Sequence, residues 1–72
     1  MIEARMLLSE ATGQHVDNVP LYATMGELQG WDSLAHMRLA LAIEERLARP
    51  LDGHEIVTIR SLADVARLLG EA

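Results

Sequence analysis

The residue with the clearest chemical potential is Ser33, because it stands where a helix is expected to begin. Asp32 precedes it, and its carboxylate can accept hydrogen bonds from backbone N–H groups one turn into that helix. From Ser33 to Ala48 no glycine or proline interrupts the run, and Ile43 is its only β-branched residue. The unpaired N–H groups of a first turn, together with the helix dipole, favour an anion there. A hydroxyl at this place is therefore well placed to carry a phosphate ester.

Catalysis by the chain itself is the weaker interpretation of this serine. The three histidines, His15, His36 and His54, lie in different segments, and only His36 is close enough in sequence to share a helix face with Ser33. A Ser–His pair is the start of nucleophilic catalysis, but no third orienting group accompanies it here. We therefore expect His36 to be solvent-exposed on a polar face. His15, Asp17 and His54 are not spaced like metal ligands, so no metal site is expected.

Charge and composition exclude several classes of protein. The 72 residues carry a formal net charge of −5, and all six basic residues are arginines. A nucleic-acid binder needs a basic face and, for base stacking, more aromatic residues than one Trp and one Tyr. There is no cysteine, no apolar run near the roughly 20 residues that span a bilayer, and no signal-peptide pattern. We expect one cytoplasmic domain, residues 1–72, that binds neither nucleic acid nor a membrane.

Hydrophobic periodicity predicts an all-α fold, a small bundle of three main helices plus a short one. The first helix covers residues 1–12 and stops at Gly13. Residues 14–31 form a long connection, which allows a short helical turn over 24–28. Apolar residues within this connection are expected to pack onto the helices; they are Val16, Val19, Leu21, Met25 and Leu28.

The second helix is expected over residues 33–48, with Pro50 ending it. Leu39, Ile43 and Leu47 should face the core, with Leu34 and Ala42 beside them. A short helix is expected within 52–59, and the last helix over 61–69. Its start, S-L-A-D at residues 61–64, is a capping-box variant in which Asp replaces the usual Glu.

Part of the second helix has no apparent partner within so small a domain. Met37 and Leu41 lie on a different side from the core positions, so the helix is apolar over more than half its circumference. Either neighbouring segments cover this side, or an apolar strip stays exposed for docking.

Two runs of sequence carry a resemblance to a known family. The first is L-Q-G-W-D-S-L at residues 28–34, followed by M-R-L at 37–39 and I-E-E at 43–45. The second is S-L-A-D-V at residues 61–65, preceded by Leu51, Ile56 and Ile59. In order and spacing they resemble the acyl and peptidyl carrier protein family, over nearly the whole chain. The resemblance implies a carrier-like bundle with a long loop between the first two helices.

The resemblance also implies a function without catalysis. A phosphopantetheinyl transferase would attach 4′-phosphopantetheine from coenzyme A to Ser33, and the thiol of that arm would hold acyl or aminoacyl groups as thioesters. The implied partners are this transferase, a loading ligase and a downstream acyltransferase or synthase, and the carrier would be a monomer. The gain is effective concentration, since delivery of a tethered substrate is intramolecular.

Individual roles follow from the same resemblance. Asp32 would cap the helix and help the transferase orient the serine, and Leu34 would enter a pocket on the transferase. The implied partner-docking residues are Met37, Arg38, Leu41, Glu44 and Glu45. For Glu44 and Glu45 a second interpretation stays open, a solvated face that forms helix pairs with nearby arginines.

Two differences from typical fatty-acid carriers indicate which kind of carrier the chain resembles. His36 and Arg38 stand where acidic residues are typical, and Trp31 precedes the motif aspartate. The chain looks more like a free-standing carrier dedicated to one pathway, or a carrier domain of an assembly line, and its cargo is open. The alternatives from other classes are a cofactor-free helical interaction module and a helix-turn-helix DNA binder.

Overall fold

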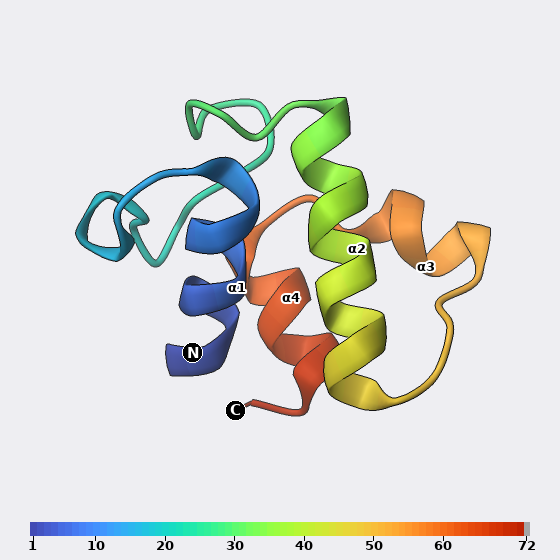
Figure 1. The fold of residues 1–72 in the computed structure, drawn as a ribbon. Helices are drawn as coiled ribbons and strands as arrows, with labels where there is room; N and C mark the ends of the chain where they lie inside the picture. The colour runs from blue at the N-terminus through green and yellow to red at the C-terminus, as the bar shows by residue number, and fades with distance from the viewer. Residues whose placement is uncertain (72) are drawn as a thin grey trace.

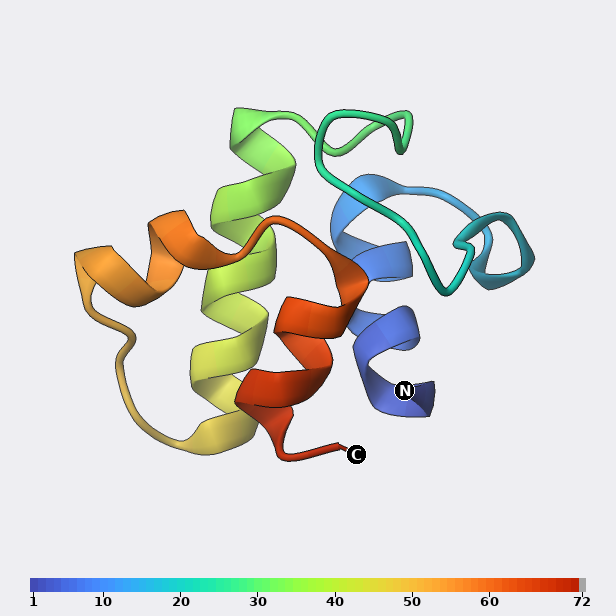
Figure 2. The ribbon, with the colours of Figure 1, turned by 180° about the vertical axis from the view of Figure 1, so that it is seen from behind.

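The computed structural model describes residues 1–71, which form four α-helices and one short 3-10 helix (Figures 1 and 2). The elements are α1 (Ile2–Thr12), η1 (Val16–Asn18), α2 (Ser33–Leu47), α3 (Gly53–Thr58) and α4 (Leu62–Leu69). The longest helix, α2, packs against α1 and α4, which also pack against each other. The predicted bundle of three main helices and a short one is confirmed, as is the long connection after the first helix.

The core lies between the three main helices. Its largest fully buried side chains include Leu8 of α1, Leu39 and Ile43 of α2, and Leu62 and Val65 of α4. Burying an aliphatic side chain of this size stabilises a fold by roughly 1.5–3 kcal/mol, so these contacts dominate the stability of so small a domain. Helical spacing predicts that α4 turns Leu62, Val65, Ala66 and Leu69 inward, and all four are buried. Leu47 of α2, also predicted to face the core, is only partly buried.

The prediction that Leu34 would lie beside the core is wrong, because this side chain is exposed. Leu34 lies on the same side of α2 as the exposed Met37 and Leu41, away from α1 and α4. Ala42 is half-buried on the side of α2 that faces α1. On α1, Ile2 and Met6 are exposed to solvent.

The connection between α1 and α2 is held by hydrogen bonds to α1 and to the segment that joins α3 to α4. Gly13 takes the left-handed conformation that ends α1, with φ of 76°. The guanidinium of Arg5 donates to the carbonyl oxygens of Val16 and Val19, at 2.8 and 3.0 Å, and so fastens η1 to α1. Further along, the backbone N–H of Met25 donates to the Arg60 oxygen at 2.9 Å, next to an isolated bridge between residues 24 and 61.

Apolar packing of the connection is only partly as predicted. Val19 is buried, and Val16, Met25 and Leu28 are partly buried, but Leu21 is exposed together with Tyr22. Ala23 is buried in place of Leu21. The turn allowed over 24–28 is present, closed by a 2.9 Å hydrogen bond from the Leu28 N–H to the Thr24 oxygen.

The start of α1 is capped from the far end of the chain. The carboxylate of Glu71 accepts hydrogen bonds from the backbone N–H groups of Ala4 and Glu3, at 2.8 and 3.1 Å. These N–H groups favour the charged carboxylate and hold the pKa of Glu71 below its usual range. Since the two partners are 67 and 68 residues away, no local pattern could predict this cap.

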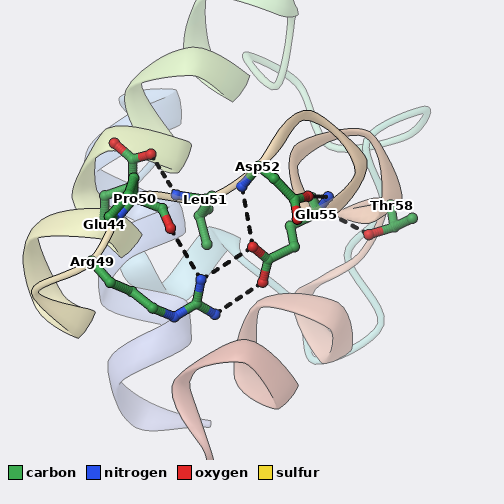
Figure 3. A network of polar contacts seen from close by, with 7 residues as sticks. All are labelled: Glu44, Arg49, Pro50, Leu51, Asp52, Glu55 and Thr58. Atoms are coloured by element: carbon green, nitrogen blue, oxygen red, sulfur yellow. Dashed lines mark hydrogen bonds and ion pairs between the residues drawn. The ribbon is translucent and has the colours of Figure 1, made fainter.

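A polar network fixes the connection between α2 and α3 (Figure 3). The helix ends at Leu47, one residue earlier than predicted, because Ala48 turns to the left-handed conformation with φ of 56°. The Arg49 guanidinium then donates to both carboxylate oxygens of Glu55, at 2.9 and 3.1 Å. Asp52 and Glu55 form a capping box at the start of α3, which the sequence analysis did not identify.

This network predicts a dependence of stability on pH. The hydrogen bond from Arg49, followed by that from the Asp52 N–H, lowers the pKa of Glu55 from 4.5 to about 2. A carboxylate whose pKa is lower in the folded state stabilises the fold above its unfolded pKa, and this contribution is lost as the pH falls toward 2. We therefore expect Glu55→Gln to lower the free energy of unfolding at pH 6 and to flatten its decline between pH 5 and 2.

Urea titrations at several pH values, followed by circular dichroism, measure this effect. The control is Glu10→Gln, since the Glu10 carboxylate is exposed and forms no ion pair with another described residue. Equal pH profiles for Glu55→Gln and the wild type would show that the Arg49–Glu55 contact does not contribute in solution.

Candidate functional site

Ser33 is the first residue of α2, and its side chain is exposed. Asp32 is the N-cap, as predicted: its Oδ1 accepts a hydrogen bond of 2.8 Å from the Ala35 N–H. The Asp32 carbonyl oxygen also accepts from the His36 N–H, at 2.8 Å. The backbone around Ser33 is thus fixed, while the hydroxyl faces solvent at the positive end of the helix dipole.

The Ser33 hydroxyl differs from every other serine and threonine hydroxyl of the chain. The other five take part in hydrogen bonds; they belong to Ser9, Thr12, Thr24, Thr58 and Ser61. Within residues 1–71, the Ser33 oxygen forms no hydrogen bond to another residue. It is therefore the hydroxyl whose modification would disturb the fold least.

The segment before Ser33 rests against the end of α1. Gly30 has a φ of 89°, and a Cβ at this position would lie 2.6 Å from the Thr12 carbonyl oxygen. Only glycine satisfies both constraints. Trp31 follows with its side chain only 4% exposed, inside the core. In the G-W-D-S run, the fold therefore explains why Gly30, Trp31 and Asp32 occupy their positions. No contact within the fold explains the serine.

His36 is buried, with 9% of its surface exposed, so the prediction of a solvent-exposed histidine is wrong. The indole Nε1–H of Trp31 donates to His36 Nδ1 at 3.0 Å, and His36 Nε2 lies 2.9 Å from the Ile56 carbonyl oxygen. Because an indole can only donate, Nδ1 accepts, and the proton of the neutral ring is on Nε2 and points to Ile56. Both nitrogens are thus used within the fold, and His36 cannot act as a base for Ser33.

An exposed apolar face runs down α2 from the site. It consists of Leu34, Met37 and Leu41, which are 61, 50 and 62% exposed. Their spacing of three and four residues places them on one side of the helix. Met37 and Leu41 are exposed, in agreement with the alternative in which no neighbouring segment covers this side.

The charged residues predicted for docking lie in different environments. Arg38 and Glu45 are exposed and border an open groove of about 570 Å³ between α1 and α2. Glu44 is half-buried, and its Oε2 accepts the Leu51 N–H at 2.7 Å, which ties α2 to the connection that follows (Figure 3). Neither interpretation of Glu44 anticipated this contact. For Glu45 both interpretations remain open.

The surroundings of Ser33 within residues 1–71 include neither of two surface hollows nor a cluster of possible metal ligands. Neither of two surface hollows found on the described part of the chain is lined by Ser33. In the same residues no three His, Asp or Glu side chains converge in a way that could hold a metal ion. None of the helices formed by residues 1–71 has the length and apolarity needed to cross a membrane.

The arrangement can present one hydroxyl, on a rigid helix start, beside an exposed apolar face. Of the predicted site residues, Asp32, Ser33 and Leu34 lie at the start of α2 and Met37 and Leu41 continue from them, whereas Glu44 is directed to the α2–α3 connection. Comparison with known proteins adds no assignment: no protein-family model matches the chain, and no curated protein matches it significantly.

Proposed function

We propose that the chain is a carrier protein of a cytoplasmic biosynthetic pathway, with 4′-phosphopantetheine attached to Ser33. The observation that carries this proposal is the state of the Ser33 hydroxyl, which is exposed at a helix start and is the one Ser or Thr hydroxyl without a hydrogen bond in residues 1–71. Together with the G-W-D-S-L run, it supports the resemblance to acyl and peptidyl carrier proteins.

The residues around Ser33 fit a phosphodiester. The first N–H groups of α2 have no partner within the helix and point toward the N-terminal end, where an anion is favoured. Asp32 already satisfies the Ala35 N–H, so the helix start stays formed whether or not Ser33 carries a group. When bound, the arm would supply a thiol, which this cysteine-free chain lacks, for thioesters of acyl or aminoacyl groups.

The exposed apolar face gives the partners a place to dock. A phosphopantetheinyl transferase, a loading ligase and a downstream acyltransferase or synthase would each approach Ser33 along Leu34, Met37 and Leu41. Arg38 and Glu45, exposed at the border of the groove, would set the charge that a partner must match. The carrier itself supplies position and effective concentration, and the partners supply the chemistry.

Intact-mass spectrometry tests this proposal. We expect the protein, incubated with a promiscuous phosphopantetheinyl transferase, Mg²⁺ and coenzyme A, to gain the mass of one phosphopantetheine group. Tandem mass spectrometry should place the group on Ser33. No mass gain by the folded protein would remove the carrier assignment.

The second candidate is a cofactor-free interaction module, which the same exposed apolar face favours. Such a module would bind its partner through Met37 and Leu41 and would stay unmodified. The mass measurement therefore separates the two candidates directly.

A further inference from the structure

We propose that His36 is a positioning residue for the modification of Ser33, acting through its hydrogen bond to Trp31. This inference rests on the proposed carrier function and deepens it. Trp31 precedes Ser33 by two residues, and His36 follows it by three, so the contact between them closes a loop around the attachment site.

Three hydrogen bonds hold this loop. Two of them, from the Ala35 N–H to Asp32 Oδ1 and from the His36 N–H to the Asp32 oxygen, are those of an ordinary capped helix start. The third, from Trp31 Nε1 to His36 Nδ1, joins a side chain outside the helix to one inside it. The two rings also stack, with centroids 6.1 Å apart and planes at 25°. The chain entering α2 is therefore held on both sides of Ser33.

Because both rings are buried, the hydrogen bond between Trp31 and His36 favours a single orientation of the two side chains. Trp31 and His36 are 4 and 9% exposed, so water cannot readily replace either partner. An indole N–H or an imidazole nitrogen left unpaired in such a place is unfavourable, and a rotated Trp31 would leave both unpaired. Since Trp31 and Ser33 are two residues apart, a displaced Trp31 would also change the direction in which the Ser33 hydroxyl leaves the helix.

The opposite side of the His36 ring serves a different purpose. Its Nε2–H donates to the Ile56 carbonyl oxygen at 2.9 Å and so attaches α3 to α2. The two hydrogen bonds of one side chain can therefore be separated by substitution. An asparagine oxygen can occupy the place of Nδ1 and keep the Trp31 contact, whereas a glutamine amide can reach the place of Nε2 and keep the Ile56 contact.

The experiment compares His36→Asn and His36→Gln as substrates of a phosphopantetheinyl transferase. We expect His36→Gln to lower the kcat of transfer about tenfold with a KM within about twofold of wild type, because docking is intact and orientation is lost. His36→Asn should keep kcat within about threefold of wild type. The chain has a single Trp, so one indole N–H signal in a ¹H–¹⁵N spectrum reports the contact. That signal should shift in His36→Gln and stay near its wild-type position in His36→Asn.

This comparison distinguishes positioning from a loss of stability. The carrier is the substrate of the transferase, so partial unfolding would lower the concentration of competent substrate and raise the apparent KM at an unchanged kcat. His54→Gln is the matched control, since His54 is exposed on α3, and it should leave both constants unchanged. If His36→Gln does not fold, Trp31→Phe removes the same donor while keeping an aromatic ring, and the same fall in kcat is expected.

Different results would overturn the positioning role of His36 and the carrier function. An unchanged kcat in His36→Gln, or an equal fall in His36→Asn, would overturn the positioning role and leave the carrier function standing. Failure of the wild-type protein to accept the group would overturn both.

Discussion

Replacing Ser33 by alanine is expected to abolish attachment of phosphopantetheine completely and to leave the fold unchanged. The variant lacks the only atom through which the group can be bound, and the Ser33 hydroxyl has no hydrogen bond within residues 1–71 to lose. The cap at Asp32, which holds the start of α2, also remains. The measurements are intact mass after transferase treatment, and circular dichroism with urea titration.

Ser61→Ala is the matched control for this prediction. Ser61 is the N-cap of α4, where its side chain accepts the Asp64 N–H in a reciprocal capping box. Its replacement should lower the free energy of unfolding by about 1 kcal/mol and leave the mass gain intact. Modification of Ser33→Ala would show that the group is attached elsewhere, and unfolding of Ser33→Ala would show that the serine is structural.

The features that the sequence predicted correctly are local ones. The caps at Asp32 and Ser61 join residues three positions apart, and the inward positions of α4 follow one helical period. Such contacts are formed within one element, so residue type and spacing determine them. The same holds for Gly13, whose left-handed conformation ends α1 as expected.

Most of the features that were wrong or missed depend on segments distant in sequence; the Asp52–Glu55 capping box is a local exception. His36 is buried because the Ile56 carbonyl oxygen, 20 residues later, meets its second ring nitrogen. Glu44 and Glu71 likewise bind backbone N–H groups of other elements, namely those of Leu51, Glu3 and Ala4. The sequence does hint at the burial of His36, because the only Trp of the chain lies five residues before it and can donate to its ring. The contact of His36 with the Ile56 carbonyl oxygen in α3 could not be predicted from the spacing of residues.

The exposed apolar face shows where sequence reasoning reaches its limit. Helical periodicity places Leu39 and Leu41 on different sides of α2, but it cannot decide whether a neighbouring segment covers both. In the structure Leu39 is fully buried, whereas Leu41 is 62% exposed. A leucine of α2 is thus part of the core at position 39, whereas the leucine two residues later faces solvent.

This contrast supports the prediction with the largest effect on stability. Leu39→Ala should lower the free energy of unfolding by about 2–5 kcal/mol, because it removes a buried side chain and leaves a cavity between the main helices. A domain of this size is only marginally stable, so the variant is expected to be largely unfolded at 25 °C. Leu41→Ala should change the free energy of unfolding by no more than about 0.5 kcal/mol.

Circular dichroism without denaturant shows whether Leu39→Ala is folded, and urea titration measures the stability of Leu41→Ala. Transferase kinetics then tests the exposed position. Because Leu41 belongs to the proposed docking face, Leu41→Ala should raise the KM for the carrier while the protein remains folded. A destabilisation of Leu41→Ala as large as that of Leu39→Ala would mean that Leu41 is covered in solution, for instance by a second copy of the chain. An unchanged KM would instead separate Leu41 from docking and leave Leu34 and Met37 as the residues through which a partner reaches Ser33.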